Sequence, residues 1–285
     1  MIAFERRQRI VSLLREQPGV KVTELASQLG VSEGTIRNDL NTLEDKGELT
    51  RVRGGAVIPQ DRPIISPAFA ARLRVNAKTK QCIARNAAAM VEDGDSILLD
   101  ASTTVFSMIP YLASCRNLTV VTNCIEAGIA LASNASHSVI LVGGTIRPHG
   151  ASVVGPLGER ILDDLHVKFA FVSCSGFSPE AGLTEVDIQE VQLKKCMIHS
   201  AERVVALIDS SKFGRVDLTS FAGLEQVSHI ITDSGLAPRF VEQLRRAGAA
   251  FTTCDDVTAW SFVPSAEAAS RQPGGEPELA AIQDR

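Results

Sequence analysis

The sequence predicts an α/β protein in two parts: an N-terminal winged helix-turn-helix joined to a larger, Rossmann-like domain with a mostly parallel sheet. Three observations lead to this prediction. The chain has 285 residues, more than one typical domain requires. Residues 1–57 combine a helical period with a closing hairpin pattern. From residue 78 onward, short β-rich apolar runs alternate with helical stretches.

The first part is expected to contain three helices and a wing. Pro18-Gly19 and Gly30 separate three helical stretches, and Ser32 is placed to cap the third. A tight glycine-containing turn between two short helices is typical of the helix-turn-helix unit. Residues 49–53 then alternate and end in a glycine pair, as the strands of a wing hairpin do.

The second domain is expected over 78–262, after a proline-stiffened linker over 58–77 in which Phe69 and Arg72 can dock. Its strands are predicted at 97–99, 118–121, 139–142, 169–172, 204–208 and 230–231. Its helices are predicted at 78–91, 103–114, 124–133, 156–165, 185–200 and 236–246. Pro110 predicts a kink or an early end in the second of these helices. Residues 263–285 have little apolar content and are expected to be a disordered tail.

The composition is that of an ordinary globular protein, with 45% hydrophobic and 22% charged residues. No apolar run approaches the roughly 20 residues that span a bilayer, and the chain starts too polar for a signal peptide. A cytoplasmic protein without a membrane partner is therefore expected. The six cysteines have no spacing suited to zinc, so neither a metal nor another cofactor is expected. Cys124 opens a predicted helix, a position that can lower a thiol pKa.

The charge distribution limits how the chain can contact nucleic acid. The net charge of −4 argues against a protein that coats nucleic acid indiscriminately. Residues 1–57 contain nine Lys and Arg residues against eight Asp and Glu residues, a charge of +1, and the rest contains 20 against 25, a charge of −5. DNA binding would therefore have to use a local basic face of the first part.

The third helix of the first part has the pattern of a recognition helix. Ile36, Leu40 and Leu43 share one face and are expected to pack on the first two helices. Asn38 lies almost opposite them, among polar residues that can bond base edges in the major groove. Arginines in the wing suit phosphate or minor-groove contacts. The residues expected to contact DNA are Ser32, Thr35, Arg37, Asn38, Asn41, Arg51 and Arg53. The alternative is a small helical module that binds protein.

Two stretches, Val31–Leu40 and Leu49–Ala56, closely resemble the signature of DeoR-type repressors of sugar metabolism, and the resemblance continues up to the tail. One position departs from the family pattern. The family usually has two successive arginines where this chain has Arg37 followed by Asn38. Losing that cation is expected to change the operator preference and to weaken phosphate contact.

Polar residues and glycines follow the predicted strands. The carboxyl ends of parallel strands meet at one edge of a sheet, where ligands bind. The turn that starts at Ser102 offers N–H and hydroxyl groups to an anion, and a glycine pair lets backbone approach a ligand. Lys212 can supply a charge for phosphate, and Asp100 or Asp209 can accept from sugar hydroxyls. The candidate effector-binding residues at these strand ends are Asp100, Ser102, Thr103, Thr104, Thr122, Asn123, Gly143, Gly144, Gly176, Asp209 and Lys212.

The resemblance to DeoR-type repressors implies a sensing domain that is similar in fold to ribose-5-phosphate isomerase and binds phosphorylated sugars or related metabolites. It adds Lys80, Arg147 and Lys194 to the candidate effector-binding residues. The family usually has a glycine where this chain has Ser102, which adds a hydroxyl and narrows the phosphate loop. The expected protein is a homo-oligomer, a dimer or tetramer, that binds a double-stranded DNA operator. The sequence is compatible with an effector that releases the operator or one that strengthens binding, and the resemblance favours release.

The candidate effector-binding residues also have purely structural interpretations. The Ser-Thr turn can serve only to cap a helix, and Asp100 and Asp209 can serve only to hold loop N–H groups. Lys194 can pair with Glu190 one helical turn away.

The alternative function is a sugar-phosphate isomerase-like enzyme fused to a DNA-binding domain. Isomerisation needs a positioned general base, and Asp100, Asp187 and Glu190 are candidates by residue type. They form no catalytic constellation that the sequence reveals, and the five histidines are scattered. A fold shared with an enzyme does not by itself imply catalysis, so no enzymatic activity is expected.

Overall fold

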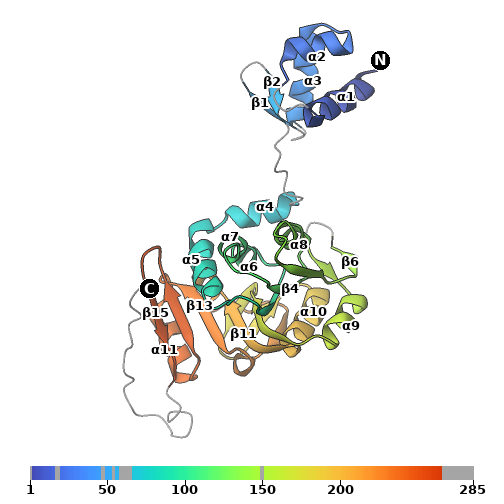
Figure 1. Ribbon diagram of the computed structural model, residues 1–285. Helices are drawn as coiled ribbons and strands as arrows, with labels where there is room; N and C mark the ends of the chain where they lie inside the picture. The colour runs from blue at the N-terminus through green and yellow to red at the C-terminus, as the bar shows by residue number, and fades with distance from the viewer. Residues whose placement is uncertain are drawn as a thin grey trace. The chain divides into compact units, whose positions relative to one another are not determined.

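The computed structural model describes residues 2–16, 20–45, 49–52, 55–57, 66–147 and 151–264 (Figure 1). The chain divides into two compact units, Met1–Pro63 and Ile64–Arg285. Nearly all of the expected tail, from residue 265, lies outside the described residues. Within the described part of the chain, no helix has the length and hydropathy needed to cross a bilayer.

The first unit is a three-helix arrangement followed by a two-stranded wing. Its elements are α1 (Ala3–Glu16), α2 (Val22–Leu29), α3 (Glu33–Asp45), β1 (Thr50–Val52) and β2 (Gly55–Val57). Ile36, Leu40 and Leu43 of α3 are buried in the core of this unit, as the helical period predicted. A Cβ at Gly55 would lie 2.6 Å from the carbonyl oxygen of Val20, so glycine allows β2 to pack this closely against the chain between α1 and α2.

The second unit is built on a central sheet. In its described residues, eight strands lie in the order β15-β14-β13-β11-β8-β3-β4-β5, and all neighbours are parallel except β14 and β15. The strands are β3 (Ser96–Leu99), β4 (Thr119–Thr122), β5 (Ser138–Leu141), β8 (Val167–Val172), β11 (Ala201–Leu207), β13 (His229–Asp233), β14 (Phe251–Cys254) and β15 (Ala259–Phe262). The fold is therefore the predicted mostly parallel α/β type.

Helices cover both faces of this sheet (Figure 1). One face packs against α5 (Ala77–Ala88), α6 (Thr103–Phe106), α7 (Ile109–Leu112) and α8 (Ile125–Ala132). The other packs against α9 (Pro156–Asp163), α10 (Ile188–His199) and α11 (Pro238–Arg246). Successive residues of a strand point to opposite faces, so Leu99 joins the first cluster and Leu98 the second. Burial on both faces explains why the strands are continuous apolar runs.

Short antiparallel strands that the sequence analysis did not anticipate flank the sheet. A hairpin is formed by β6 (Thr145–Ile146) and β7 (Val153–Val154). A second small sheet has the order β12-β10-β9, with β9 (Gly176–Ser178), β10 (Gly182–Glu185) and β12 (Thr219–Ala222). The predicted helix over 103–114 is divided into α6 and α7, and Pro110 lies in the first turn of α7, consistent with its expected effect.

Part of the segment expected to be a linker is helical. Helix α4 (Pro67–Arg74) begins after Ser66, whose hydroxyl accepts a hydrogen bond from the Phe69 amide. Phe69 is fully buried against α8 and α6, where it meets Phe106 edge-to-face at 5.3 Å. The docking expected of Phe69 is therefore confirmed. Residues 58–65 lie outside the described residues.

Candidate functional site

The outward face of α3 is exposed. The Ser32 hydroxyl accepts a hydrogen bond from the Thr35 amide at 3.1 Å, which caps the helix as predicted. Arg37, Asn38 and Asn41 are all exposed on the side away from the core. Arg37 forms an exposed ion pair with Glu33 at 3.1 Å, a contact that a phosphate or a base edge can replace at little cost.

Asp39 holds α3 against α1 from its inner side. Its carboxylate is 4% exposed, and it accepts hydrogen bonds from Arg6 and Arg7 at 2.5 and 3.5 Å. The sequence analysis missed these pairs because the partners lie more than 30 positions apart along the chain. They fix the orientation of α3, because a buried carboxylate needs its partners.

The wing is tied to α3 through polar contacts. The Arg51 guanidinium donates to the Asn41 side chain, and the Arg51 amide donates to Glu44 at 3.0 Å. These bonds place Arg51, which is exposed, next to the outward face of α3. Arg53, the other wing residue expected to contact DNA, lies outside the described residues.

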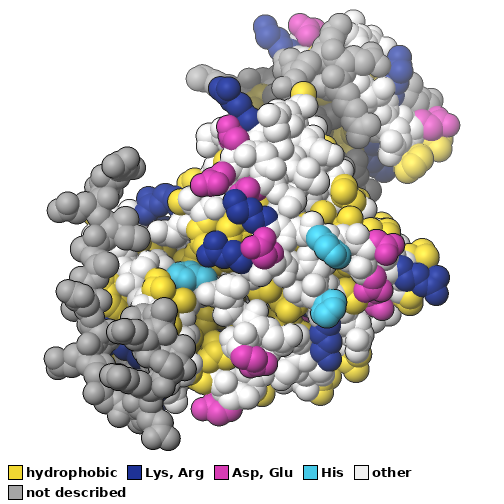
Figure 2. Space-filling view, turned by 60° about the horizontal axis from the view of Figure 1, so that its bottom comes forward, with side chains coloured by type: hydrophobic (Ala, Val, Ile, Leu, Met, Phe, Trp, Pro, Cys, Tyr) yellow, Lys and Arg dark blue, Asp and Glu magenta, His cyan; other side chains and the backbone are white. Residues whose placement is uncertain are grey.

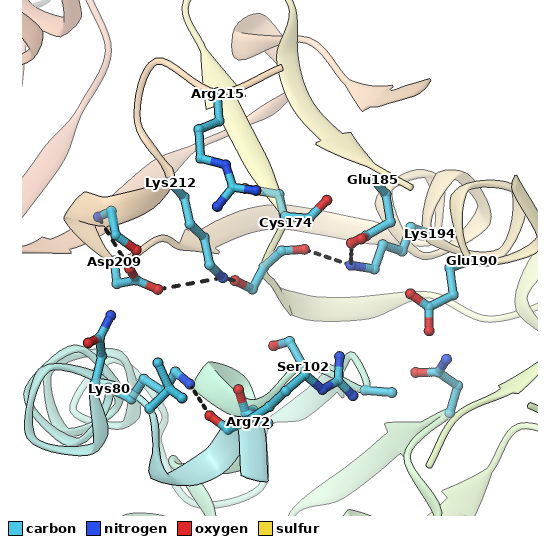
Figure 3. Close-up of a pocket in the computed structure, with 18 residues that line it drawn as sticks. Arg72, Lys80, Ser102, Cys174, Glu185, Glu190, Lys194, Asp209, Lys212 and Arg215 are labelled. Carbon is cyan, nitrogen blue, oxygen red and sulfur yellow. Dashed lines mark hydrogen bonds and ion pairs between the residues drawn. The ribbon is translucent and has the colours of Figure 1, made fainter. Parts of the chain in front are cut away.

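A cavity of about 320 Å³ opens at the carboxyl ends of the central strands. The loops after β3, β4, β8 and β11 form its wall, together with residues of α10 and the α4–α5 connection (Figure 3). The candidate effector-binding residues that line it are Lys80, Ser102, Thr103, Asn123, Lys194, Asp209 and Lys212. The strand-end loops therefore converge on one cavity.

Basic side chains face one another across part of this cavity. Lys212 and Arg215 come from the loop after β11, and Lys80 comes from α5 on the opposite side (Figure 3). The Lys212 ammonium lies 3.1 Å from the Ser173 hydroxyl and 3.7 Å from Asp209. Among the described residues, no carboxylate lies within ion-pair distance of Lys80 or Arg215. Burial, followed by the charge of Lys212, lowers the pKa of Lys80. Of these three cations, only Lys212 therefore has an ion-pair partner, Asp209, among the described residues.

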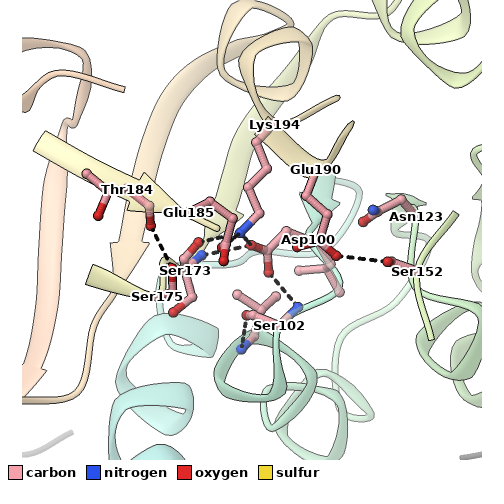
Figure 4. Close-up of polar contacts among 12 residues, drawn as sticks. Asp100, Ser102, Asn123, Ser152, Ser173, Ser175, Thr184, Glu185, Glu190 and Lys194 are labelled. Atoms are coloured by element: carbon pink, nitrogen blue, oxygen red, sulfur yellow. Dashed lines mark hydrogen bonds and ion pairs between the residues drawn. The ribbon is translucent and has the colours of Figure 1, made fainter. Parts of the chain in front are cut away.

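A buried ionic cluster forms the floor of the cavity (Figure 4). The Lys194 ammonium lies 3.2 Å from Asp100 and 2.9 Å from Glu185, and donates to the Ser173 carbonyl at 2.7 Å. Burial alone would lower the pKa of Lys194, but these two carboxylates raise it. Burial disfavours the charged form of Glu185, yet Lys194 holds its pKa below the usual value. The expected alternative pairing of Lys194 with Glu190 is wrong.

Asp100 organises two loops. Its two carboxylate oxygens accept hydrogen bonds from the amides of Ser102 at 3.0 Å and Ser173 at 2.9 Å, and it contacts Lys194 as well. Asp100 therefore holds loop N–H groups, as its purely structural interpretation proposed. Ser102 caps α6 through the Val105 amide at 3.2 Å and also lines the cavity.

The remaining wall of the cavity offers acceptors. Glu190 accepts from Arg147 and from the Ser152 hydroxyl, the latter at 2.9 Å. Asn123 is 3% exposed and donates to the Val153 carbonyl at 3.2 Å, while its side-chain oxygen has no hydrogen-bond partner among the described residues. An unpartnered acceptor in a polar cavity is suited to a ligand hydroxyl.

Several candidates do not line the cavity. The Thr122 hydroxyl donates to the Leu99 carbonyl of the neighbouring strand β3 and accepts from the Cys124 amide, and Thr104 is fully buried. Arg147 is paired with Asp187 at 2.9 Å and with Glu190, so it reaches the cavity only through Glu190. The glycines serve close packing: a Cβ at Gly144 would meet the Val154 carbonyl oxygen at 2.4 Å and one at Gly176 the Arg215 carbonyl oxygen at 2.7 Å, while Gly143 faces α9. The cavity-lining residues that the sequence analysis did not assign are Arg72, Val75, Asn76, Ala101, Ser173, Cys174, Ser175, Glu185, Glu190, Ser211 and Arg215.

The part of the chain that the structure describes places neither a reactive thiol nor a metal-binding cluster at the site. Cys124 precedes α8 as expected, but burial raises its pKa to about 12, so the expected lowering is wrong. Burial likewise raises the pKa of Cys174, in the cavity wall, to about 12. Within the described ranges, no three His, Cys, Asp or Glu side chains are grouped so that they could hold a metal ion.

The face of the molecule in Figure 2 shows no continuous basic patch among its described residues. Lys and Arg side chains lie among Asp and Glu side chains there, in keeping with the net negative charge of the chain. In the cavity, by contrast, Lys80 and Arg215 have no carboxylate within ion-pair distance among the described residues.

Comparisons with known proteins cover both units. Residues 6–62 match the DeoR-like helix-turn-helix domain, and residues 75–234 match the DeoR C terminal sensor domain. The chain is 40% identical over 245 residues to the uncharacterized HTH-type transcriptional regulator YulB of Bacillus subtilis, covering 86% of this chain and 94% of the relative. It is 31% identical over 245 residues to a putative aga operon transcriptional repressor of Escherichia coli O157:H7, covering 86% of this chain and 91% of the relative.

Among solved structures, the chain is similar to ribose 5-phosphate isomerase A from Methanocaldococcus jannaschii, with 20% identity and a TM-score of 0.35. The match covers 48% of this chain and 55% of that chain, so the chain spans about half the length of that isomerase. A likeness at this level carries no information about activity.

Proposed function

Since the chain belongs to the DeoR family of DNA-binding transcriptional regulators, we propose that it represses genes of sugar metabolism and is released from its operator by a phosphorylated sugar. The observation that carries the effector half of this proposal is a cavity at the carboxyl ends of the sheet strands in which Lys80 and Arg215, beside Lys212, have no carboxylate within ion-pair distance among the described residues. A relative named as a transcriptional repressor supports the direction of control.

The exposed face of α3 supports operator binding. Arg37, Asn38 and Asn41 can reach base edges, and each bidentate pair contributes about 1–3 kcal/mol of discrimination between bases. Arg51 lies beside this face and can bind phosphate, which adds affinity but little sequence preference. With Asn38 in place of a second arginine, we expect a preference for adenine at the base it contacts.

The cavity supports a phosphorylated sugar in both its charge and its size. Lys80, Lys212 and Arg215 provide donors for a phosphate group, which would give Lys80 and Arg215 the anionic partner that they lack among the described residues. The Asn123 side-chain oxygen and Glu190 provide acceptors for sugar hydroxyls. A volume of about 320 Å³ suits a small metabolite.

Catalysis has no support from the side chains proposed as general bases. Asp100 is engaged by Lys194 and two loop amides, and Glu190 is engaged by Arg147 and Ser152. Asp187 caps α10 through two backbone amides. Membership of the DeoR family places the chain among transcriptional regulators rather than enzymes.

The proposed regulator acts in the cytoplasm as a homo-oligomer, a dimer or tetramer, whose paired first units bind repeated half-sites. The effector must bind the DNA-competent and released states with different affinity, because otherwise it could not shift the equilibrium between them. The residues between the two units are the route by which that shift would reach the DNA.

The test is a mobility-shift assay on the DNA upstream of the chain's own gene, with and without a panel of pentose and hexose phosphates. We expect a specific complex that at least one sugar phosphate dissociates, whereas the unphosphorylated sugar does not. Thermal stabilisation by the same compound, with no product formed, would accompany this result. Measurable isomerisation would favour the enzyme, and absence of both a DNA complex and a ligand shift would favour a protein-interaction module.

A further inference from the structure

The Lys80 ammonium connects helix α4 to the cavity. Lys80 is 6% exposed, lines the cavity, and donates a hydrogen bond to the Arg72 carbonyl oxygen at 2.6 Å (Figure 3). Helix α4 ends at Arg74, so the carbonyl groups of its last turn have no donor from a following turn. A cation at this position also complements the negative end of the helix dipole. Lys80 is therefore the carboxyl-terminal cap of α4.

The other end of α4 is anchored independently of the cavity. Phe69 is fully buried among Cys124, Ala127 and Phe106. The Ser66 amide donates to the carboxylate of Glu126 at 3.2 Å. The chain that precedes Ser66 leads to the DNA-binding unit. Helix α4 thus has an apolar anchor where it receives the chain from that unit and, near its other end, a hydrogen bond from the Lys80 ammonium.

The connection between α4 and α5 is itself part of the cavity wall. Arg72, Val75 and Asn76 all line the cavity. Asn76 has a φ of 53°, a left-handed conformation that residues other than glycine seldom adopt. A ligand in the cavity would therefore contact the end of α4, the connection and Lys80 together.

An anion in the cavity would compete with α4 for Lys80. Within the described part of the chain, no carboxylate lies within ion-pair distance of its ammonium, which donates instead to the neutral carbonyl of Arg72. Hydrogen bonds between a cation and an anion are about twice as strong as those between neutral groups. Lys212 and Arg215 line the same cavity, so an anion that binds them lies in the region that Lys80 also faces.

We propose that Lys80 is a latch whose transfer from the Arg72 carbonyl to a bound anion uncaps α4. The uncapped helix is then free to move about its Phe69 anchor. This movement would change the position of the chain that leads to the DNA-binding unit when an anion binds in the cavity. This inference takes from the proposed function only that the bound anion is a phosphorylated sugar. The cap itself is a property of the protein without ligand.

The test is amide hydrogen exchange of the full chain, followed in the peptides that cover residues 66–76, with inorganic phosphate and ribose 5-phosphate as probes. Losing one hydrogen bond at a helix end should speed exchange in α4 about 5-fold. We expect this acceleration in the wild-type protein when a probe binds. In Lys80→Met, exchange should be fast without a probe and unchanged by it. Lys78→Met, an exposed lysine on the same helix, is the matched control and should behave as wild type.

Calorimetry on the same samples separates the latch from the proposed function. If a probe binds the wild-type protein and exchange in α4 stays the same or slows, the latch is wrong while the effector proposal stands. If free Lys80→Met exchanges like wild type, the cap is wrong whatever binds. If neither these probes nor other sugar phosphates bind, the proposed effector is wrong and the anion step fails with it. The comparison of wild type with and without probe does not depend on the variant folding.

Discussion

Replacing Lys194 by methionine should destabilise the second unit, because the change removes the cation from a buried ionic cluster and keeps most of the side-chain volume. Asp100 and Glu185 would lose the ammonium that lies 3.2 and 2.9 Å from them. Their side chains are 0% and 14% exposed, so water cannot replace the lost partner at Asp100 and can do so only partly at Glu185.

The size of the effect follows from this burial. Removing one partner of a buried ion pair costs about 3–5 kcal/mol, since it leaves an uncompensated charge. Each kcal/mol lowers the melting temperature of a unit of this size by about 2–4 °C, so a fall of roughly 6–20 °C is expected. Asp100 also holds the loops after β3 and β8, so the variant should bind the effector more weakly.

Thermal and urea unfolding measure this change, with Lys195→Met as the control. Lys195 is the next residue of α10 and is exposed, so its replacement should alter stability by less than about 0.5 kcal/mol. The double variant Lys194→Met/Glu185→Gln should recover part of the loss, because one of the two stranded carboxylates is gone. A Lys194→Met protein that unfolds like wild type would refute the assignment of an ionic floor.

The pH dependence gives a second check on the same cluster. In the wild type, Lys194 holds the pKa of Glu185 below 4.5, so this carboxylate stabilises the folded state above pH 4.5 and the gain is lost as the pH falls through the lowered pKa. Without Lys194, burial raises the pKa of Glu185. Protonation of Glu185 at low pH then removes the buried negative charge that destabilises the variant. The stability difference between wild type and variant should therefore shrink as the pH falls below about 5.

The remaining predictions concern the two binding surfaces and one histidine. Arg37→Ala should weaken specific operator binding about 5- to 150-fold in a mobility-shift titration and leave the effector-induced thermal shift intact; unchanged operator affinity would remove Arg37 from the DNA interface. Lys212→Ala should abolish release by the sugar phosphate while DNA binding persists, and a normal response would remove Lys212 from the cavity's anion site; Lys195→Ala should respond as wild type. Burial and Arg203 lower the pKa of His229 below 6.5, so the unfolded chain takes up this proton first and stability should fall as the pH drops below 6.5. Urea unfolding at pH 7.5 and 5.5 should show a smaller pH effect in His229→Gln, and an equal effect would contradict the assignment.

Six of the eight described strands of the central sheet and most helices of the second unit could be predicted, because burial on both faces imposes a simple pattern; β14 and β15 were missed. Each predicted strand is a short apolar run, and the structure contains a strand at every one of those positions. The small sheet of β9, β10 and β12 could not be found this way, since each of its strands contains only one large apolar side chain and so forms no apolar run. Helix α4 was concealed by the prolines around it.

The cavity could be predicted in outline but not in its pairings. Strand ends converge by topology, which is why Ser102, Asn123 and Lys212 line one cavity as expected. Glu185 belongs to the small sheet and Arg215 to the loop that precedes β12. Their place in the cavity wall could not be predicted, because the sequence pattern did not reveal these strands. The partners of Lys194 were missed as well. Asp100 is distant in the chain, and nearby Glu190, which has the helical spacing for a pair with Lys194, is paired with Arg147 instead.

The cavity has an ionic floor, formed by Lys194, Asp100 and Glu185, and a rim, by which we mean Lys80, Lys212, Arg215 and Asn123. This division has a consequence for redesign. The floor satisfies its own charges through Lys194, so it can remain constant while the rim is rebuilt for another metabolite. Substitutions at Arg215 and Asn123 alter donors and acceptors without stranding a buried charge. Libraries built at these rim positions are a rational starting point for converting the chain into a reporter of a chosen anionic compound.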